Sequence, residues 1–224
     1  MADECGRLVE MRARGVFWDG ERMYTRNSAP GSRVYGEALL SCDGIEYREW
    51  VPTRSKLAAY VRMGGVSFPF VPTSRVLYLG AASGTTASHV ADICAKGTVY
   101  CVEISPRSFR DLVTVCETRR NMVPILSDAT RPAQYKFVVE RPDVVYQDIA
   151  QKNQAAILVK NMKEFGVKVG MLALKARSED VTRQPSDIYK ESASYLASEG
   201  FVVQETVELD PLEKDHAMLV VGIR

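Results

Sequence analysis

The sequence has few of the residues that build metal sites or disulfide frameworks. It contains only two histidines, His89 and His216, and an odd number of cysteines, five. The cysteines form no C-x-x-C pair, so we expect no zinc or other metal site, and thiols in this pattern fit a reducing, cytoplasmic setting. Cys94 and Cys101 lie in apolar runs, and we expect them to fill the core.

Long apolar runs and an excess of one charge are also absent. No run approaches the ~18 residues of a membrane-spanning helix, and Met1 to Arg7 has no apolar stretch of the signal type. The chain has 224 residues, with 29 basic and 28 acidic side chains. A net charge near zero gives no overall field that would hold a membrane or an RNA. We therefore expect a cytoplasmic protein without a membrane partner, whose nucleic-acid contacts come from a local patch or from partner proteins.

The pattern of apolar and turn-forming residues changes near residue 70. Before it, short aromatic and β-branched runs alternate with turn formers. Val16–Trp18 and Met23–Thr25 flank Asp19-Gly20, which indicates a β-hairpin. We interpret residues 1–55 as a small N-terminal antiparallel β module and residues 56–224 as a second, larger domain.

After residue 70, strands alternate with helices, which predicts an α/β fold with a mostly parallel, Rossmann-like sheet. The expected strands are 75–79, 98–104, 122–126, 144–146 and 167–174, and the expected helices are 84–95, 106–119, 153–165 and 186–197. Two further strands, 201–209 and 217–223, follow each other too closely for a crossover helix. We expect this last pair to be antiparallel at one edge of the sheet.

The first strand of this series runs into a glycine turn, Gly80-Ala81-Ala82-Ser83-Gly84, followed by Thr85 and Thr86. Glycines permit a tight turn and a close approach of the backbone to a ligand. Ala82 stands where dinucleotide-binding folds usually carry a second glycine, and its methyl group would crowd a pyrophosphate. The carboxylate of a methionine moiety needs only a helix N-terminus and a hydroxyl or two, which the threonines can supply.

Acidic residues end the next two strands. Glu103 lies about 20 residues after Gly80, where a carboxylate holds ribose hydroxyls in nucleotide-binding folds. Asp128 follows the next strand and could accept a hydrogen bond from an adenine amine. The turn and these two acids together predict S-adenosylmethionine as the cofactor. The alternative is a Rossmann-like domain that binds no nucleotide.

Four more polar residues are candidates for catalysis: Lys56, Asp148, Lys175 and His216. Asp148 and Lys175 each follow an apolar strand, at the edge where open α/β sheets bind ligands. Taken alone, Lys56, Lys175 and His216 also fit solvated surface positions. Together they suit methylation of a ribose hydroxyl, because a lysine can act as the base if burial and a second cation lower its pKa well below ~10.4. Their spacing in sequence does not show whether they lie close together.

Several long motifs resemble the fibrillarin family, the RNA 2′-O-methyltransferases of box C/D guide-RNA particles. The resemblance covers nearly the whole chain and is closest over residues 50–59, 78–90, 102–108, 128–132, 143–151 and 174–178. It implies a class I methyltransferase domain. The Gly/Arg-rich extension of the eukaryotic members is missing, so the chain is similar to the archaeal form.

The resemblance implies specific site residues. The catalytic set would be Lys56, Asp148, Lys175 and His216, with Lys175 as the base or as the group that orients the hydroxyl. The cofactor contacts would be Gly80, Ala81, Thr85, Thr86, Glu103, Ile104, Asp128, Ala129, Asp148 and Gln151. An aromatic residue is common in the family at the position of Ile104, so here the adenine would stack on an aliphatic side chain.

The resemblance also implies partners. These are a Nop-domain scaffold protein, a kink-turn-binding protein of the ribosomal type, a box C/D guide RNA and a target RNA in pre-rRNA or tRNA. Two other functions stay open from the sequence: a scaffold subunit that binds the cofactor without catalysis, and a methyltransferase for small molecules on the same fold.

A basic segment is the remaining feature of interest. Residues 151–177 contain Lys152, Lys160, Lys163, Lys168, Lys175 and Arg177 and a single acid, Glu164. The segment is either a solvated helix face or a basic rim that guides an RNA backbone.

Overall fold

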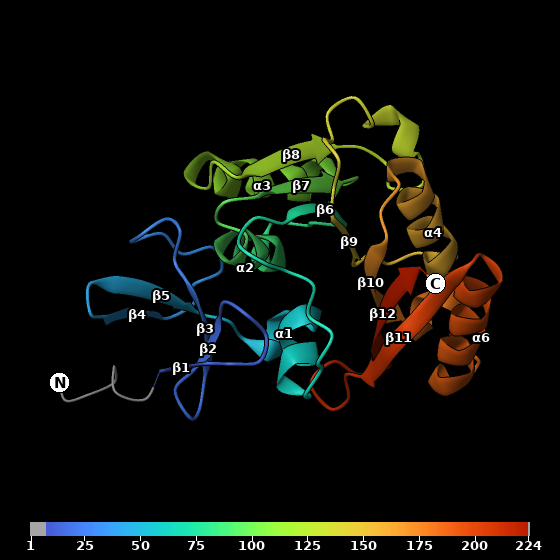
Figure 1. The fold of residues 1–224 in the computed structure, drawn as a ribbon, viewed down its shortest axis with the longest axis horizontal. Helices are drawn as coiled ribbons and strands as arrows, with labels where there is room; N and C mark the ends of the chain where they lie inside the picture. Colours follow the sequence, from blue (N-terminus) through green and yellow to red (C-terminus); the bar gives the residue numbers. More distant parts are fainter. Residues whose placement is uncertain (1–7, 224) are drawn as a thin grey trace.

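Two sheets make up the fold of residues 8–223, the part of the chain that the computed structural model describes (Figure 1). The smaller sheet is antiparallel and has five strands in the order β1-β2-β3-β5-β4. Its strands are β1 (Val9–Glu10), β2 (Val16–Trp18), β3 (Met23–Arg26), β4 (Leu39–Cys42) and β5 (Ile45–Glu49). Val16 pairs with Thr25 across the Asp19-Gly20 turn, which confirms the predicted hairpin.

The larger sheet has seven strands in the order β11-β12-β10-β9-β6-β7-β8. These are β6 (Arg75–Leu79), β7 (Thr98–Glu103), β8 (Met122–Leu126), β9 (Val144–Gln147), β10 (Val169–Lys175), β11 (Phe201–Glu208) and β12 (His216–Ile223). Strands β6 to β10 are parallel to one another, whereas β12 is antiparallel to both β10 and β11. The predicted mostly parallel sheet with an antiparallel last pair is confirmed.

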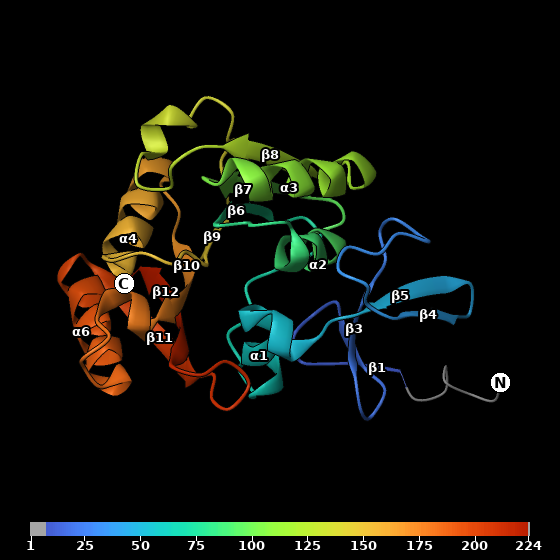
Figure 2. The same cartoon turned by 180° about the vertical axis from the view of Figure 1, so that it is seen from behind.

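Helices cover both faces of this sheet (Figures 1 and 2). On the face towards the small sheet lie α1 (Lys56–Arg62), α2 (Thr85–Ile93) and α3 (Pro106–Thr118). On the other face lie α4 (Gln154–Phe165) and α6 (Pro185–Ser198), with the short α5 (Ala176–Glu179) between them in the chain. Two 3-10 helices, η2 (Pro52–Arg54) and η3 (Pro132–Gln134), lie in the connecting segments.

The alternation of side chains along each strand divides the core into two. Val76 and Tyr78 of β6 pack with α1 and α2, whereas Leu77 and Leu79 pack with the α4 side. Because strand side chains alternate with a period of two, residues two apart point to the same face. By this rule Tyr146 shares the α1 face with the position of Asp148, and Ala173 shares it with Lys175.

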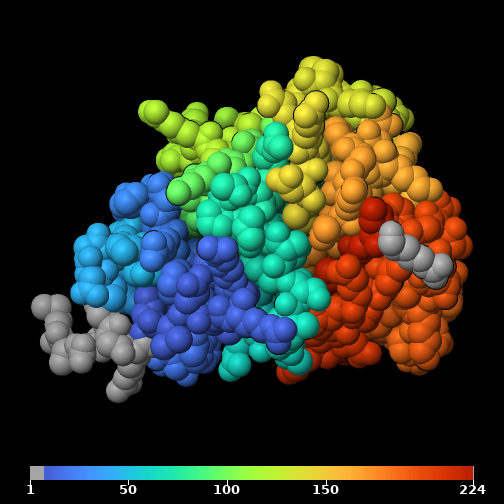
Figure 3. Space-filling view, viewed as in Figure 1, coloured from blue at the N-terminus to red at the C-terminus, as the bar shows by residue number. Residues whose placement is uncertain are grey.

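A buried charge network joins the small sheet to α2. The guanidinium group of Arg48, which is 0% exposed, forms ion pairs with Glu37 and with Asp92, the latter at 2.8 Å. It also donates a 3.0 Å hydrogen bond to the hydroxyl of Ser88. A buried arginine requires such partners, because an unpaired charge in the interior is very costly. Figure 3 shows the blue N-terminal residues directly against the blue-green segment that follows them in the chain. The predicted boundary at residue 55 stays a prediction.

Two kinds of feature are missing from residues 8–223. No helix there is long and apolar enough to cross a membrane. No group of three or more His, Cys, Asp or Glu side chains there is arranged to hold a metal ion. Cys94 and Cys101 are buried in the core, as predicted, and Cys5 and the rest of Met1 to Arg7 lie outside the described residues.

Candidate active site

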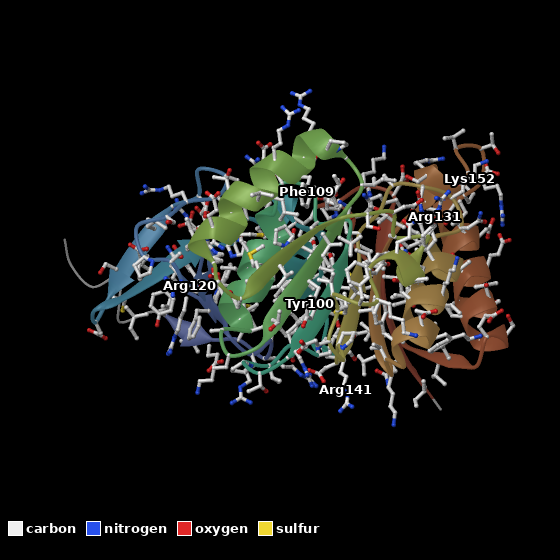
Figure 4. The ribbon with its side chains drawn as sticks, turned by 90° about the horizontal axis from the view of Figure 1, so that it is seen from above. Tyr100, Phe109, Arg120, Arg131, Arg141 and Lys152 are labelled. Atoms are coloured by element: carbon white, nitrogen blue, oxygen red, sulfur yellow. The ribbon has the colours of Figure 1, made fainter. Side chains whose placement is uncertain are left out.

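The carboxyl ends of the parallel strands gather the predicted residues at one edge of the large sheet. Figure 4 labels Phe109, Arg131 and Lys152, which follow β7, β8 and β9, in the upper half of the view, and Arg141, which precedes β9, at the bottom. Because β6 to β10 are parallel to one another, their carboxyl ends lie at the same edge of the sheet. Open α/β sheets bind their ligands there.

A cavity of about 300 Å³ opens at this edge. This volume is at the lower end of the range for ligand pockets. Seven of the predicted cofactor residues line it: Gly80, Glu103, Ile104, Asp128, Ala129, Asp148 and Gln151. The proposed catalytic Lys175 also lines it, and so do residues that the sequence analysis did not assign to the site, among them Val102, Ser127 and Ile149.

Gly80 is required where β6 ends beside β9. Its φ of +82° is in the left-handed region, and a Cβ atom on it would lie 2.3 Å from the carbonyl oxygen of Asp148. That distance is far below any van der Waals contact, so no larger residue fits without moving the end of β9. The close approach keeps Asp148 beside the turn.

Two carboxylates on the cavity wall are held in fixed orientations. Glu103 is 8% exposed and accepts hydrogen bonds from the backbone N–H groups of Ala82 at 2.8 Å and Ser105 at 2.7 Å. Further lone pairs of this carboxylate remain available for a ligand. Burial opposes ionisation of Asp128, but hydrogen bonds from Thr130 and the charges of Arg131 and Lys160 hold the pKa of Asp128 below its ordinary value.

Three predicted cofactor residues do not line this cavity. Ala81 is buried behind the turn, and the hydroxyl of Thr86 donates a 3.0 Å hydrogen bond to Ser55. Thr85 begins α2 and lines a second cavity on the other side of the turn. A role for these three in cofactor binding stays a prediction.

Asp148 joins the two predicted lysines. Its Oδ1 lies 2.9 Å from Nζ of Lys175, and its Oδ2 lies 3.4 Å from Nζ of Lys56. The three side chains are only 14 to 18% exposed. Sequence positions that are far apart therefore meet in one partly buried ion triad at the edge of the cavity.

His216 completes the predicted set. It pairs with Lys175 in the register of β12 against β10, and its Nδ1 lies 2.6 Å from the carbonyl oxygen of Lys214. A carbonyl oxygen can only accept a hydrogen bond, so Nδ1 carries the proton and Nε2 keeps a lone pair. Burial lowers the pKa of His216, the Lys214 carbonyl opposes this, and the charges of Lys56 and Lys175 lower the pKa further.

The position of Lys56 depends on Ser55, which the sequence analysis did not assign to the site. The hydroxyl of Ser55 caps α1 by accepting a hydrogen bond from the N–H of Ala58 at 3.3 Å. The same oxygen accepts from Nε1 of Trp50 at 3.1 Å and from the hydroxyl of Thr86. A serine immediately before a helical run is a capping signal that could have indicated this role.

Several basic residues of the segment 151–177 have partners from distant parts of the sequence. Lys163 pairs with Glu199 at 2.5 Å, and Arg177 pairs with Asp215 at 3.0 Å. Nζ of Lys160 donates to the carbonyl of Thr130. These contacts favour the solvated-face interpretation for much of the segment.

Comparison with known proteins agrees with this geometry. The fibrillarin family model matches residues 9–224. The chain belongs to the fibrillarin family. It is 50% identical over 204 residues to the fibrillarin-like rRNA/tRNA 2′-O-methyltransferase of Thermococcus gammatolerans, and the match covers 90% of each chain.

Two solved fibrillarin structures are also similar. The crystal structure of Aeropyrum pernix fibrillarin with natively bound S-adenosyl-L-methionine is 46% identical, with a TM-score of 0.87 and a match over 96% of this chain and 97% of that one. The crystal structure of a fibrillarin/Nop5p complex is 39% identical, with a TM-score of 0.88 and a match over 96% of this chain and 100% of that one.

Proposed function

We propose that the chain transfers a methyl group from S-adenosylmethionine to a ribose 2′-hydroxyl of RNA. The observation that carries this proposal is the triad in which Asp148 binds both Lys56 and Lys175 at the wall of the cavity. Membership of the fibrillarin family supports it, as does the relative that is named a 2′-O-methyltransferase.

The side chains at the cavity suit S-adenosylmethionine. Glu103 would hold the ribose hydroxyls of the cofactor, and Asp128 would accept from its adenine amine. Ile104, which is 61% exposed, offers an aliphatic surface for the adenine ring. The carboxylate of Asp148 can balance the positive charge of a sulfonium. When bound, the cofactor supplies an electrophilic methyl group, which leaves as the C–S bond breaks and the new O–C bond forms.

The chain then has to hold the hydroxyl and receive its proton. Lys175, fixed by Asp148, donates a hydrogen bond that orients the ribose oxygen, and Lys56 adds positive charge as negative charge develops on that oxygen. Nε2 of the neutral His216 provides the lone pair that can accept the proton. The triad positions the nucleophile, and no covalent enzyme intermediate is needed.

The same proposal includes partners. A Nop-domain scaffold protein would bind the chain, as Nop5p binds the fibrillarin in the solved complex. A kink-turn-binding protein and a box C/D guide RNA would then select the target nucleotide in pre-rRNA or tRNA. Relatives of this chain are archaeal, so we place this assembly in the cytoplasm.

The decisive assay is tritium transfer from labelled S-adenosylmethionine to a target RNA in a particle reconstituted with the scaffold, the kink-turn protein and a guide. We expect transfer to the guided nucleotide only when guide and scaffold are both present. A cofactor-binding scaffold without catalysis would give a stable particle that transfers no label. Transfer to small molecules but not to RNA would instead support the small-molecule alternative.

A further inference from the structure

A second cavity lies on the other side of the glycine turn. Its volume is about 500 Å³. The first cavity is lined by Gly80 and Ala82, and the second by Ser83 and Thr85, so the turn separates the two. The remaining walls come from residues 32–35, from Arg54, and from α3 and its C-cap Arg119. We call this second cavity the arginine cleft.

Arg54 is an exposed cation that is held in place without an acidic partner. Its Cζ lies 5.2 Å from the centre of the Tyr35 ring, a cation–π contact. Tyr35 is itself fixed, because its hydroxyl donates to the carbonyl of Glu49 at 2.8 Å and lies 2.8 Å from Nε2 of His89. Within residues 8–223, no carboxylate forms an ion pair with Arg54.

Arg33 adds a second cation to the same cleft. Its Nε donates to the carbonyl of Glu37 at 3.0 Å, which orients the guanidinium group, and it too has no ion-pair partner within the described chain. Arg119 differs because it is buried and lies 3.5 Å from Asp92. One exposed acid, Asp111, also lines the cleft. The exposed charge of the lining is therefore positive.

Hydroxyl groups supply most of the remaining polar lining. They belong to Ser32, Ser83, Thr85, Thr114 and Thr118. Arginine, serine and threonine side chains are the groups that commonly contact phosphate and sugar oxygens of nucleic acids. The cleft therefore has the chemistry of a backbone-binding surface, with no side chain arranged to read a base.

The cleft is rigidly connected to the proposed transfer centre. Arg54 is separated by one residue from Lys56, which lies 3.4 Å from Asp148. The intervening Ser55 is buried and bound to both Trp50 and Thr86. Arg54 and the triad residue Lys56 are therefore held by the same anchored segment, residues 54–56.

We propose that the arginine cleft binds the phosphate backbone of the RNA strand next to the ribose that is methylated, with Arg33 and Arg54 as the contacting cations. The inference rests on the proposed function, because it assumes an RNA substrate. The continuity with the transfer centre and the hydroxyl-rich lining favour RNA over an acidic protein surface, which the test below distinguishes.

The test compares Arg33→Gln, Arg54→Gln and the double variant with a matched control. Arg26→Gln is that control, because Arg26 is also exposed and lies over an aromatic ring, Phe17, at 5.5 Å, but lines a different cavity. In the assembled particle, KM for the target RNA should rise roughly 5-fold for each arginine lost. The turnover number kcat should stay unchanged, since these contacts form equally in the ground and transition states.

The salt dependence of RNA binding gives a second readout. The slope of log affinity against log salt should fall by about 1 for each lost phosphate contact. Arg54→Lys should keep the slope, because it retains the charge, and affinity for S-adenosylmethionine should not change in any variant. A purely structural role for Arg54 would not give this pattern.

Three results would overturn the inference: a double variant with the KM and salt slope of the wild type, an Arg26→Gln variant that is equally impaired, or a loss of affinity for the scaffold protein with RNA binding intact. The last result would assign the cleft to an acidic protein. Failure of the proposed function looks different, because then the wild-type particle itself transfers no methyl group while the salt slopes still report on the cleft.

Discussion

Oδ1 of Asp148 lies 2.9 Å from Nζ of Lys175, and the other oxygen of the same carboxylate lies 3.4 Å from Nζ of Lys56. The two lysines come from different parts of the fold, one from the start of α1 and one from the end of β10. A single negative charge thus positions two positive charges beside the cavity. The geometry makes Asp148 the residue on which the arrangement depends.

Replacing Asp148 by asparagine tests whether the charge of this carboxylate holds the two lysines in position. Asp148→Asn keeps the size of the side chain but leaves two ammonium groups facing each other without a counter-ion, so neither lysine stays in place. We expect methyl transfer to fall by about 10²- to 10⁴-fold. Glu191→Gln removes an exposed acid that pairs with Arg183 and serves as the control. Activity of Asp148→Asn equal to that of the control would contradict the positioning role.

The pH dependence of the rate tests His216. Its pKa is lowered from 6.5, so the neutral form persists below that pH, and a proton acceptor is lost only when the histidine is finally protonated. The rate of methyl transfer should therefore stay level as pH falls to about 6.5 and decline only below it. His216→Gln should lower the rate and remove this acidic limb. An acidic limb that is identical in wild type and variant would exclude His216 as the titrating group.

Gly80 should tolerate no side chain because an added Cβ atom would clash with the backbone of Asp148. A second glycine variant, Gly166→Ala, isolates the effect of that clash. Gly80→Ala adds a Cβ atom 2.3 Å from the Asp148 carbonyl, at a φ of +82°. Gly166→Ala also has a positive φ, +65°, but nothing lies within 4 Å of the added atom. In the control, only the strain of a left-handed alanine should lower the free energy of unfolding, by about 1–2 kcal/mol. The free energy of unfolding of Gly80→Ala should fall further, and this variant should also bind S-adenosylmethionine more weakly in calorimetry. Equal losses in the two variants would show that the clash is unimportant.

Much of the fold can be predicted from the sequence, because the hydrophobic periodicity of each strand and helix is a local property. The strands expected at 75–79 and 122–126 are β6 and β8, and the helix expected from residue 106 begins there as α3. The expected and observed elements differ at their ends. The helix expected from Gly84 begins at Thr85, because Gly84 has a left-handed φ of +91° and acts as the N-cap. Strand β9 extends to Gln147, since Gln147 pairs with both Leu79 and Leu172.

Contacts between distant segments could not be predicted in this way. Lys175 alone fits a lysine that reaches solvent, and only the order of β9 beside β10 brings it to Asp148. Arg48, between Tyr47 and Glu49, has the pattern of an exposed strand residue. It is fully buried because Glu37 and Asp92, from other elements, surround it. Such charge pairs leave no signal in a single sequence.

Arg48 also gives a prediction on stability. Arg48→Ala would leave the buried Glu37 without its ion-pair partner and would leave Asp92 with Arg119 alone, at 3.5 Å. We expect the free energy of unfolding to fall by about 3–5 kcal/mol in denaturant titrations. The control Arg22→Ala removes an arginine that is 49% exposed and lies 3.9 Å from Glu49, so its effect should be at most about 1 kcal/mol. A similar small loss for Arg48→Ala would mean that the network does not hold the small sheet in place.

The most direct test of the central claim is the rate of methyl transfer by Lys175→Ala in the reconstituted particle, measured beside cofactor affinity. Lys163→Ala is the control, because Lys163 is 54% exposed and pairs with Glu199 on the surface. We predict that Lys175→Ala abolishes transfer to the guided ribose while its affinity for S-adenosylmethionine and that of the control stay near wild type. Full transfer by Lys175→Ala would contradict the assignment of this triad as the site of ribose methylation.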